Sequence, residues 1–201
     1  KVQLMKAIYQ NAIEKSITYD AYRTVIDELI LQNKSTGHDQ SELAVDFTKL
    51  NQQRMKRLDK TLVLEKNTID AVQAIEKKQV WLLLTESWCG DAAQNVPILN
   101  KIAAINNLID LRIVLRDDND ELMQRYLTNG GKSIPKLISV SEDLESELFT
   151  WGPRPEEAIQ LVVNLKSKYG GITEDVKEAL QKWYNEDKGI SLQNEIITLL
   201  I

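Results

Sequence analysis

The sequence is poor in the residues that most often carry chemistry, with one cysteine and one histidine among 201 residues. The single cysteine, Cys89, excludes a disulfide within the chain, a dithiol redox pair and a zinc site made of several thiolates. The single histidine, His38, lies in a polar segment, residues 34–41, which indicates a solvated loop rather than the base of a catalytic pair. The sequence therefore implies neither a metal nor an organic cofactor.

Long apolar runs and an excess of positive charge are also missing. The longest uninterrupted apolar run, residues 80–84, has five members, far short of the roughly 20 that span a bilayer. The chain carries 25 Lys and Arg against 30 Asp and Glu, a formal charge of −5, which disfavours nucleic acid or an anionic membrane as a partner. No charged-then-apolar leader segment precedes the first helical pattern, so a cytoplasmic location is expected.

The first 66 residues form one predicted unit, an N-terminal helical extension. Apolar residues recur at helical spacing over residues 2–30, with a break near residues 16–20, and again from Leu43 to Leu62. We expect three amphipathic helices. Their apolar faces either pack on the chain's own core, which we favour, or bind a partner protein or a second copy of the chain.

A domain of mixed α/β character is predicted for residues 67–170, and a helical tail for residues 171–201. The predicted element order is α-β-α-β-α-β-β-α, with a parallel β-α-β unit of right-handed crossover followed by an antiparallel hairpin. The expected helices are 67–78, 90–106, 120–127 and 156–169, and the expected strands are 80–85, 111–115, 136–140 and 144–151. Asn129-Gly130-Gly131 is interpreted as a left-handed cap of the third of these helices, and Ser191 as the cap of a last helical turn.

The candidate site is the segment Ser87-Trp88-Cys89-Gly90-Asp91-Ala92, where a buried strand passes into a helix. A sulfur at a helix N-terminus faces unpaired N–H groups and the positive end of the helix dipole, and both lower the pKa of a thiol. Asp91 acts in the opposite direction, since its carboxylate repels a thiolate. The residues alone do not decide the sign of the net shift.

At this segment the chain resembles the thioredoxin superfamily. Its residues 88–92 stand where that family has Trp-Cys-Gly-Pro-Cys, and Pro97 matches the proline that kinks the family's active-site helix. Ser133-Ile134-Pro135-Lys136 resembles the segment in which a cis-proline faces the motif. The resemblance covers residues 67–170 and implies a three-layer thioredoxin-like fold with a mixed sheet. Within the superfamily, the chain looks like a bacterial thioredoxin-like subgroup with the single-cysteine motif Trp-Cys-Gly-Asp-Ala.

The departures from the family pattern remove the dithiol cycle. Ala92 replaces the second cysteine, Asp91 the proline between the two cysteines, and Leu83 the buried acid that acts as the internal base. Cys89 and Asp91 are the candidate catalytic residues. The resemblance further implies binding roles around them for Trp88, Gly90, Ile134, Pro135, Trp151 and Arg154. Arg154 stabilises the thiolate, holds a ligand carboxylate, or pairs with Glu156 or Asp91.

Two functions from different classes follow. In the first, the protein is a monothiol redox protein whose Cys89 attacks a protein disulfide, a low-molecular-weight thiol's disulfide or a peroxide, and an external thiol resolves the product. In the second, it is a catalytically inactive thioredoxin-fold module that binds a peptide or protein. A third possibility is that residues 1–66 fold over Cys89 as a lid.

Three other patterns are given structural interpretations. The segment Gly130-Gly131-Lys132-Ser133 follows a helix, not the strand that a phosphate loop requires. The acids of residues 117–121 favour a helix start rather than a calcium loop. No two carboxylates are expected to meet at strand ends as a hydrolase pair.

Overall fold

The protein folds around a four-stranded mixed sheet with helices on both faces, as a computed structural model describes it for residues 2–200. The strands lie in the order β2-β1-β3-β4, with β1 parallel to β2, and with β3 antiparallel to both β1 and β4. Their bounds are Gln79–Thr85 (β1), Ile109–Leu115 (β2), Lys136–Ser141 (β3) and Glu147–Trp151 (β4).

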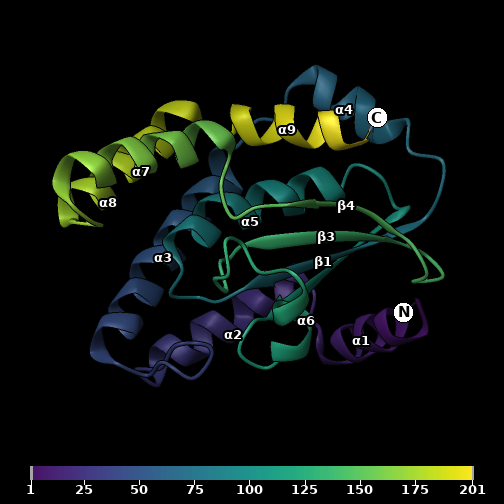
Figure 1. The fold of residues 1–201 in the computed structure, drawn as a ribbon, viewed down its shortest axis with the longest axis horizontal. Coiled ribbons are helices and arrows are strands. Elements are labelled where there is room, and N and C mark those ends of the chain that lie inside the picture. Colours follow the sequence, from purple (N-terminus) through teal and green to yellow (C-terminus); the bar gives the residue numbers. More distant parts are fainter. Residues whose placement is uncertain (1, 201) are drawn as a thin grey trace.

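The helices complete a layered molecule (Figure 1). In that view α4, α5 and α9 lie over one face of the sheet, and α1, α2 and α6 lie across the other. The helix bounds are Val2–Lys15 (α1), Tyr19–Leu31 (α2), Glu42–Thr61 (α3), Lys66–Gln73 (α4), Gly90–Ala103 (α5), Asp120–Arg125 (α6), Glu156–Tyr169 (α7), Glu174–Asp187 (α8) and Ile190–Leu200 (α9). The expected fold class, α/β and thioredoxin-like with helical extensions, is confirmed.

Strand β1 is the centre of the core, as its unbroken apolar run predicts. Trp81, Leu82, Leu83 and Leu84 are all fully buried, because helices cover both faces of the sheet and leave no polar side to the strand. This strand delivers the chain directly into the Cys89 segment at its carboxyl end. Helix α5 follows and carries Pro97 in its interior.

The N-terminal helices belong to the same core as the sheet. Ile8 of α1, Ile26 of α2 and Met55 of α3 are buried in one cluster with the strands. Between α1 and α2, Ile17 pairs with Ile113 of β2 through two backbone hydrogen bonds. The extension therefore packs on the chain's own core and also covers part of the β2 edge, which would otherwise be open to pairing with another chain.

Helices α7 and α8 form a hairpin with its own small core. Val162 of α7 packs with Val176 and Leu180 of α8 in a cluster separate from the main one. Figure 1 shows the hairpin extending beyond the sheet, whereas α9 returns over it beside α4. Leu192 and Ile196 of α9 are fully buried in the main core.

Several boundaries differ from the prediction for local reasons. The helix expected at 67–78 ends at Gln73, and the strand expected from residue 144 begins at Glu147. Leu144 has a φ of +62° inside the hairpin turn, a conformation incompatible with a strand. The apolar character of Leu144 reflects its burial in the turn rather than a place in the sheet.

Two capping predictions were wrong. Helix α6 ends at Arg125, and Asn129 and Gly130, with φ of +51° and +77°, form a tight turn whose ends, Thr128 and Gly131, exchange two backbone hydrogen bonds. Ser191 lies within the first turn of α9, where its N–H and hydroxyl donate to the Asp187 carboxylate. Over residues 2–200, no helix has both the length and the apolarity needed to cross a bilayer.

The backbone at Gly152, in the β4–α7 turn, passes very close to the backbone of Pro135. Its φ is +112°, and a Cβ built there would lie 2.3 Å from the carbonyl oxygen of Pro135. We expect Gly152→Ala to lower the free energy of unfolding by about 2–4 kcal/mol, because the backbone must move and an unfavourable φ is imposed. Urea unfolding followed by circular dichroism measures this.

Gly171→Ala is the matched control, since a Cβ at Gly171 meets no atom within 4 Å. The control should change the free energy of unfolding by less than about 0.5 kcal/mol. Equal effects of the two substitutions would show that the close approach at Gly152 is unimportant.

Candidate functional site

Cys89 lies where β1 passes into α5, and it is the N-cap of that helix. Its Sγ accepts a hydrogen bond from the Ala92 N–H at 3.4 Å and donates one to the Ile134 carbonyl oxygen at 3.3 Å. The Ile134–Pro135 peptide bond is cis, as predicted. The motif and the proline segment, 45 residues apart in the chain, therefore meet through the sulfur itself.

The Cys89 thiol is held in its neutral form. Burial and the neighbouring Asp91 carboxylate raise the pKa of Cys89 to about 12, although N–H groups of the first helical turn and Arg154 act against them. Cys89 is only 8% exposed, and burial disfavours the charged form of any thiol. The sign that the sequence left open is thus decided by desolvation.

Asp91 is held by two residues from distant parts of the chain. The Arg154 Nε donates to Asp91 Oδ1 at 2.8 Å, and its Nη2 lies 2.7 Å from Oδ2, a two-point ion pair. The Tyr184 hydroxyl of α8 also donates to Oδ1, at 2.7 Å. Of the roles considered for Arg154, pairing with Asp91 is the one that the structure contains.

A cavity of about 300 Å³ opens beside this cluster, and Cys89, Gly90, Asp91 and Arg154 are among its lining residues. Helix α3 forms one wall and the α7–α8 hairpin another. A Cβ at Gly90 would lie 3.4 Å from both Arg54 Nη1 and Gln181 Nε2. A glycine at this position therefore lets α3 and α8 approach the motif closely.

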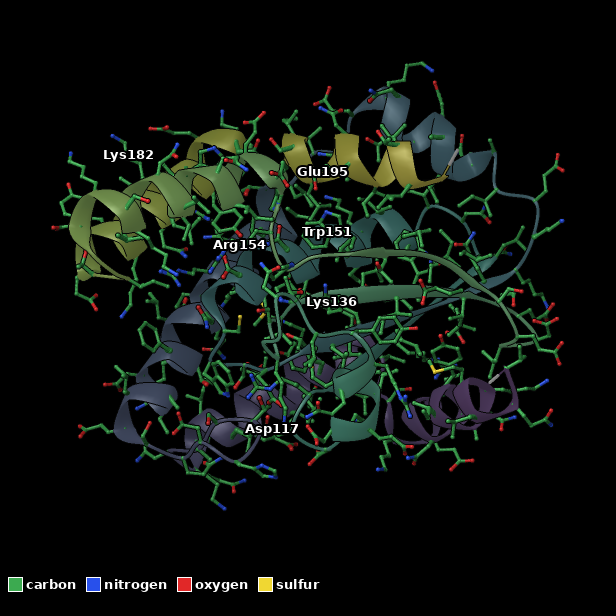
Figure 2. All side chains as sticks on the ribbon, in the orientation of Figure 1. Asp117, Lys136, Trp151, Arg154, Lys182 and Glu195 are labelled. Carbon is green, nitrogen blue, oxygen red and sulfur yellow. The ribbon has the colours of Figure 1, made fainter. Side chains whose placement is uncertain are left out.

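Of the remaining predicted binding residues, Trp88 lines this cavity, whereas Ile134, Pro135 and Trp151 do not. Trp88 lines the cavity, and the Arg116 guanidinium lies 4.9 Å from the centroid of its ring. Ile134 and Pro135 are buried, so their backbone is not an open edge for an extended peptide. Trp151 lies outside the cavity lining, because its indole N–H donates to Glu195 of α9 at 2.7 Å (Figure 2).

Two residues of the N-terminal extension hold the motif through Ser87: Thr36 in the loop before α3, and Asn51 in α3. The Ser87 N–H donates to Thr36 Oγ1 at 2.7 Å, and the Asn51 amide donates to the Ser87 carbonyl oxygen at 2.9 Å. The extension therefore covers the motif in part, as the lid hypothesis supposes. Helix α8, which that hypothesis omitted, closes the other side. No local sequence pattern distinguishes these site residues from ordinary helix and loop residues, so they were not predicted: Thr36, Asn51, Arg54 and Tyr184.

One pair of carboxylates does meet at strand ends, contrary to the prediction. Glu86 follows β1 and is fully buried, and its Oε1 accepts from the N–H of Asp117, which follows β2, at 2.9 Å. Burial raises the pKa of Glu86. His38 is exposed, as expected, but its backbone N–H donates to Asp117 at 2.8 Å. Within residues 2–200, no three acidic, Cys or His side chains converge as metal ligands.

The strand order, the cis-proline and the cysteine at the helix start together define a thioredoxin-like α/β protein. The comparison with families agrees, because residues 37–184 match a family described as thioredoxin. The chain belongs to this family. No curated protein matches it.

Two solved structures share the fold. One is a protein of unknown function from Pseudomonas aeruginosa, 19% identical, with a TM-score of 0.57, 87% of this chain covered and 95% of that one. The other is an HIV epitope scaffold, 18% identical, with a TM-score of 0.55 and coverages of 87% and 96%. At these identities the likeness establishes the fold alone.

The raised pKa of Cys89 predicts a slow and strongly pH-dependent alkylation. With a pKa of about 12, the thiolate fraction at pH 8 is ~10⁻⁴, against about a quarter for a free cysteine. Iodoacetamide should therefore modify the native protein roughly a thousand times more slowly than free cysteine. The rate should still rise about tenfold per pH unit up to pH 10.

The same chain unfolded in urea is the control, and its rate should level off above pH 9. If the alkylation rate of the native protein levelled off below pH 9, the assignment of a neutral Cys89 thiol would be contradicted.

The ion pair of Arg154 and Asp91 should contribute measurably to stability, because it is largely shielded and has two contacts. The side chains are 24% and 12% exposed. Arg154→Leu should lower the free energy of unfolding by about 2 kcal/mol, since it leaves the Asp91 carboxylate without its cation. Lys132→Met, which breaks the exposed pair with Asp120, should cost less than about 1 kcal/mol. Equal losses in urea unfolding would refute the special role of the Arg154 pair.

Proposed function

We propose that this protein is a ligand-binding member of the thioredoxin family in which the motif cysteine is a structural thiol and not a redox nucleophile. The observation that carries the proposal is the state of Cys89, which is buried, hydrogen-bonded in both directions and raised in pKa to about 12. A nucleophilic cysteine needs the opposite environment, partly exposed and electropositive.

The cation beside the sulfur supports the same proposal. Arg154 would stabilise a thiolate if its charge were free, but both its Nε and its Nη2 contact the Asp91 carboxylate. The pair is therefore close to neutral where it faces the sulfur. Of the two charges, that of Asp91 has the larger effect on the thiol and raises the pKa of Cys89, whereas that of Arg154 lowers it.

The burial of the Ile134–Pro135 segment limits where a ligand can bind. Ile134 and Pro135 are buried, and the Ile134 carbonyl oxygen already accepts from the Cys89 thiol. A peptide adding to this backbone would have to displace that bond and the covering segments. The cavity beside Cys89 is open and lined by α3, α7 and α8, so it is the better candidate for a ligand site.

Monothiol redox activity is the competing function, and one observation favours it: Cys89 is among the residues lining the cavity. In that reaction the Cys89 thiolate attacks a disulfide, one sulfur bonds to Cys89 and the other leaves as a thiolate, and an external thiol later releases Cys89. A bacterial origin, a cytoplasmic location, and a partner or second copy bound through the helical extensions stay predictions from the sequence.

Mass spectrometry after incubation with oxidised glutathione at pH 7.5 distinguishes the two functions. We expect no glutathione adduct on the native protein in the time that fully modifies the same chain in urea, because the thiolate is a very small fraction of the folded state. The urea sample is a matched control, since it contains the same single cysteine. An adduct that forms on the native protein as fast as on the unfolded chain would establish the redox function.

A further inference from the structure

We propose that the cavity beside Cys89 binds a small amphipathic monocarboxylate, with the carboxylate on Arg54 and a single hydrocarbon chain between α3 and the α7–α8 hairpin. This inference rests on the proposed function and names its ligand class. It comes from the distribution of charge and apolar surface around the cavity.

Arg54 provides the cation. It lies on α3, lines the cavity and is half-buried, and its Nη1 donates to the neutral Asn51 side chain at 3.0 Å. Among residues 2–200 no carboxylate lies within ion-pair distance of Arg54, whereas Arg154 across the same cavity is fully paired. A partly buried guanidinium is unfavourable when the nearby carboxylate, here that of Asp91, lies beyond ion-pair distance and is already paired with Arg154. A ligand carboxylate would compensate Arg54 with two parallel hydrogen bonds.

Apolar side chains supply the rest of the wall. Phe47 comes from α3, and Val162, Val176 and Leu180 come from the hairpin. Lys177 of α8 also lines the cavity, and its ammonium lies 5.9 Å from the centroid of the Phe47 ring. Since the cavity volume of about 300 Å³ is at the small end for ligand sites, a single short chain fits better than a bulky or branched ligand.

The charge of the head group is limited by Asp91. Its carboxylate lines the same cavity and is balanced by Arg154, and the ammonium of Lys177 is paired with Glu174 at 2.6 Å. Among the described residues that line the cavity, Arg54 is therefore the cation that has no carboxylate within ion-pair distance. A monoanion neutralises that charge, whereas a dianion would add repulsion from Asp91.

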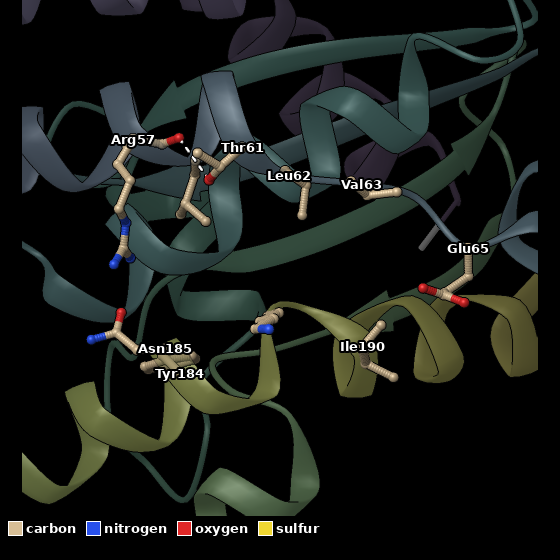
Figure 3. Close-up of a pocket in the computed structure, with 10 residues that line it drawn as sticks. Arg57, Thr61, Leu62, Val63, Glu65, Tyr184, Asn185 and Ile190 are labelled. Carbon is tan, nitrogen blue, oxygen red and sulfur yellow. Dashed lines mark hydrogen bonds between the residues drawn. The ribbon is translucent and has the colours of Figure 1, made fainter.

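A second cavity, of about 490 Å³, lies one turn further along α3 and offers a contrast (Figure 3). Arg57 lines it and points toward Asn185 of α8. Tyr184 also lines it, while the hydroxyl of Tyr184 bonds Asp91. Arg57 is exposed, so its charge carries no desolvation cost that a ligand carboxylate could offset. It therefore serves as a control for Arg54 in the same helix.

Isothermal titration calorimetry with octanoate tests the proposal, with 1-octanol as the uncharged probe of the same length. We expect octanoate to bind the intact protein with one site per chain and at least tenfold tighter than 1-octanol. Arg54→Gln should weaken octanoate binding about tenfold or more and leave 1-octanol binding unchanged. Arg57→Gln should change neither by more than about twofold.

The hydrocarbon wall is tested by a second pair of variants. Ile172 lines the cavity and is 54% exposed, and Val163 of α7 is 50% exposed and is not among the lining residues. Ile172→Asn should weaken both probes severalfold, and Val163→Asn should weaken neither. Both positions are exposed, so the folded chain is retained even if Arg54→Gln perturbs folding.

The proposal fails if octanoate shows no saturation up to millimolar concentration, or if Arg54→Gln and Arg57→Gln weaken its binding equally. Either result, with Cys89 still inert toward oxidised glutathione, removes the ligand class and leaves the proposed function standing. A reactive Cys89 removes the proposed function whatever octanoate does.

Discussion

The carboxylate of Asp91 is the point on which the site depends, because it joins three segments that are distant in the sequence. Arg154 brings the β4–α7 turn to the start of α5, and Tyr184 brings α8 to the same atom, Asp91 Oδ1. Each contact is charged or charge-assisted, and such bonds are shorter, stronger and more directional than neutral ones. The start of α5 is therefore tied directly to the C-terminal hairpin, and the cavity exists because these segments are held there.

Burial, together with the same carboxylate, explains why a cysteine at a helix N-terminus is not activated here. The favourable effect of a helix dipole on a nearby anion is about 0.3–1 kcal/mol, less than one pKa unit. Full burial shifts a pKa by up to about 3–5 units in the other direction, and Asp91 adds to it. Dithiol members of the superfamily have a second cysteine where this chain has Ala92, and with that residue missing nothing in the site requires Cys89 to ionise.

Much of the fold, and only part of the site, could be predicted from the sequence. The fully buried run of β1 and the period change near residue 67 depend on local patterns, so the strands and their order along the chain were predictable. That the proline segment faces Cys89 was implied by the resemblance to the thioredoxin superfamily. The burial of Cys89 was not, because Thr36 and Tyr184, which cover the site, come from segments 53 and 95 residues away in the sequence. The position of Trp151 outside the cavity lining was not predictable for a related reason: its indole is oriented by Glu195 of α9, which no pattern in residues 151–155 indicates.

The way in which the hairpin is attached bears on what the cavity is for. Since α7 and α8 bury their own apolar cluster, they need little apolar contact with the main core. The contacts that attach them are polar: Gln181 accepts from Gln94 at 2.9 Å, and Tyr184 accepts from Asn95 at 3.1 Å. Polar contacts fix a geometry without requiring the space between to be filled, so apolar side chains on both walls can stay apart. Close packing is the rule in interiors, and an apolar space that is kept open by directional bonds, with Arg54 at its edge, has the form of a site for a ligand.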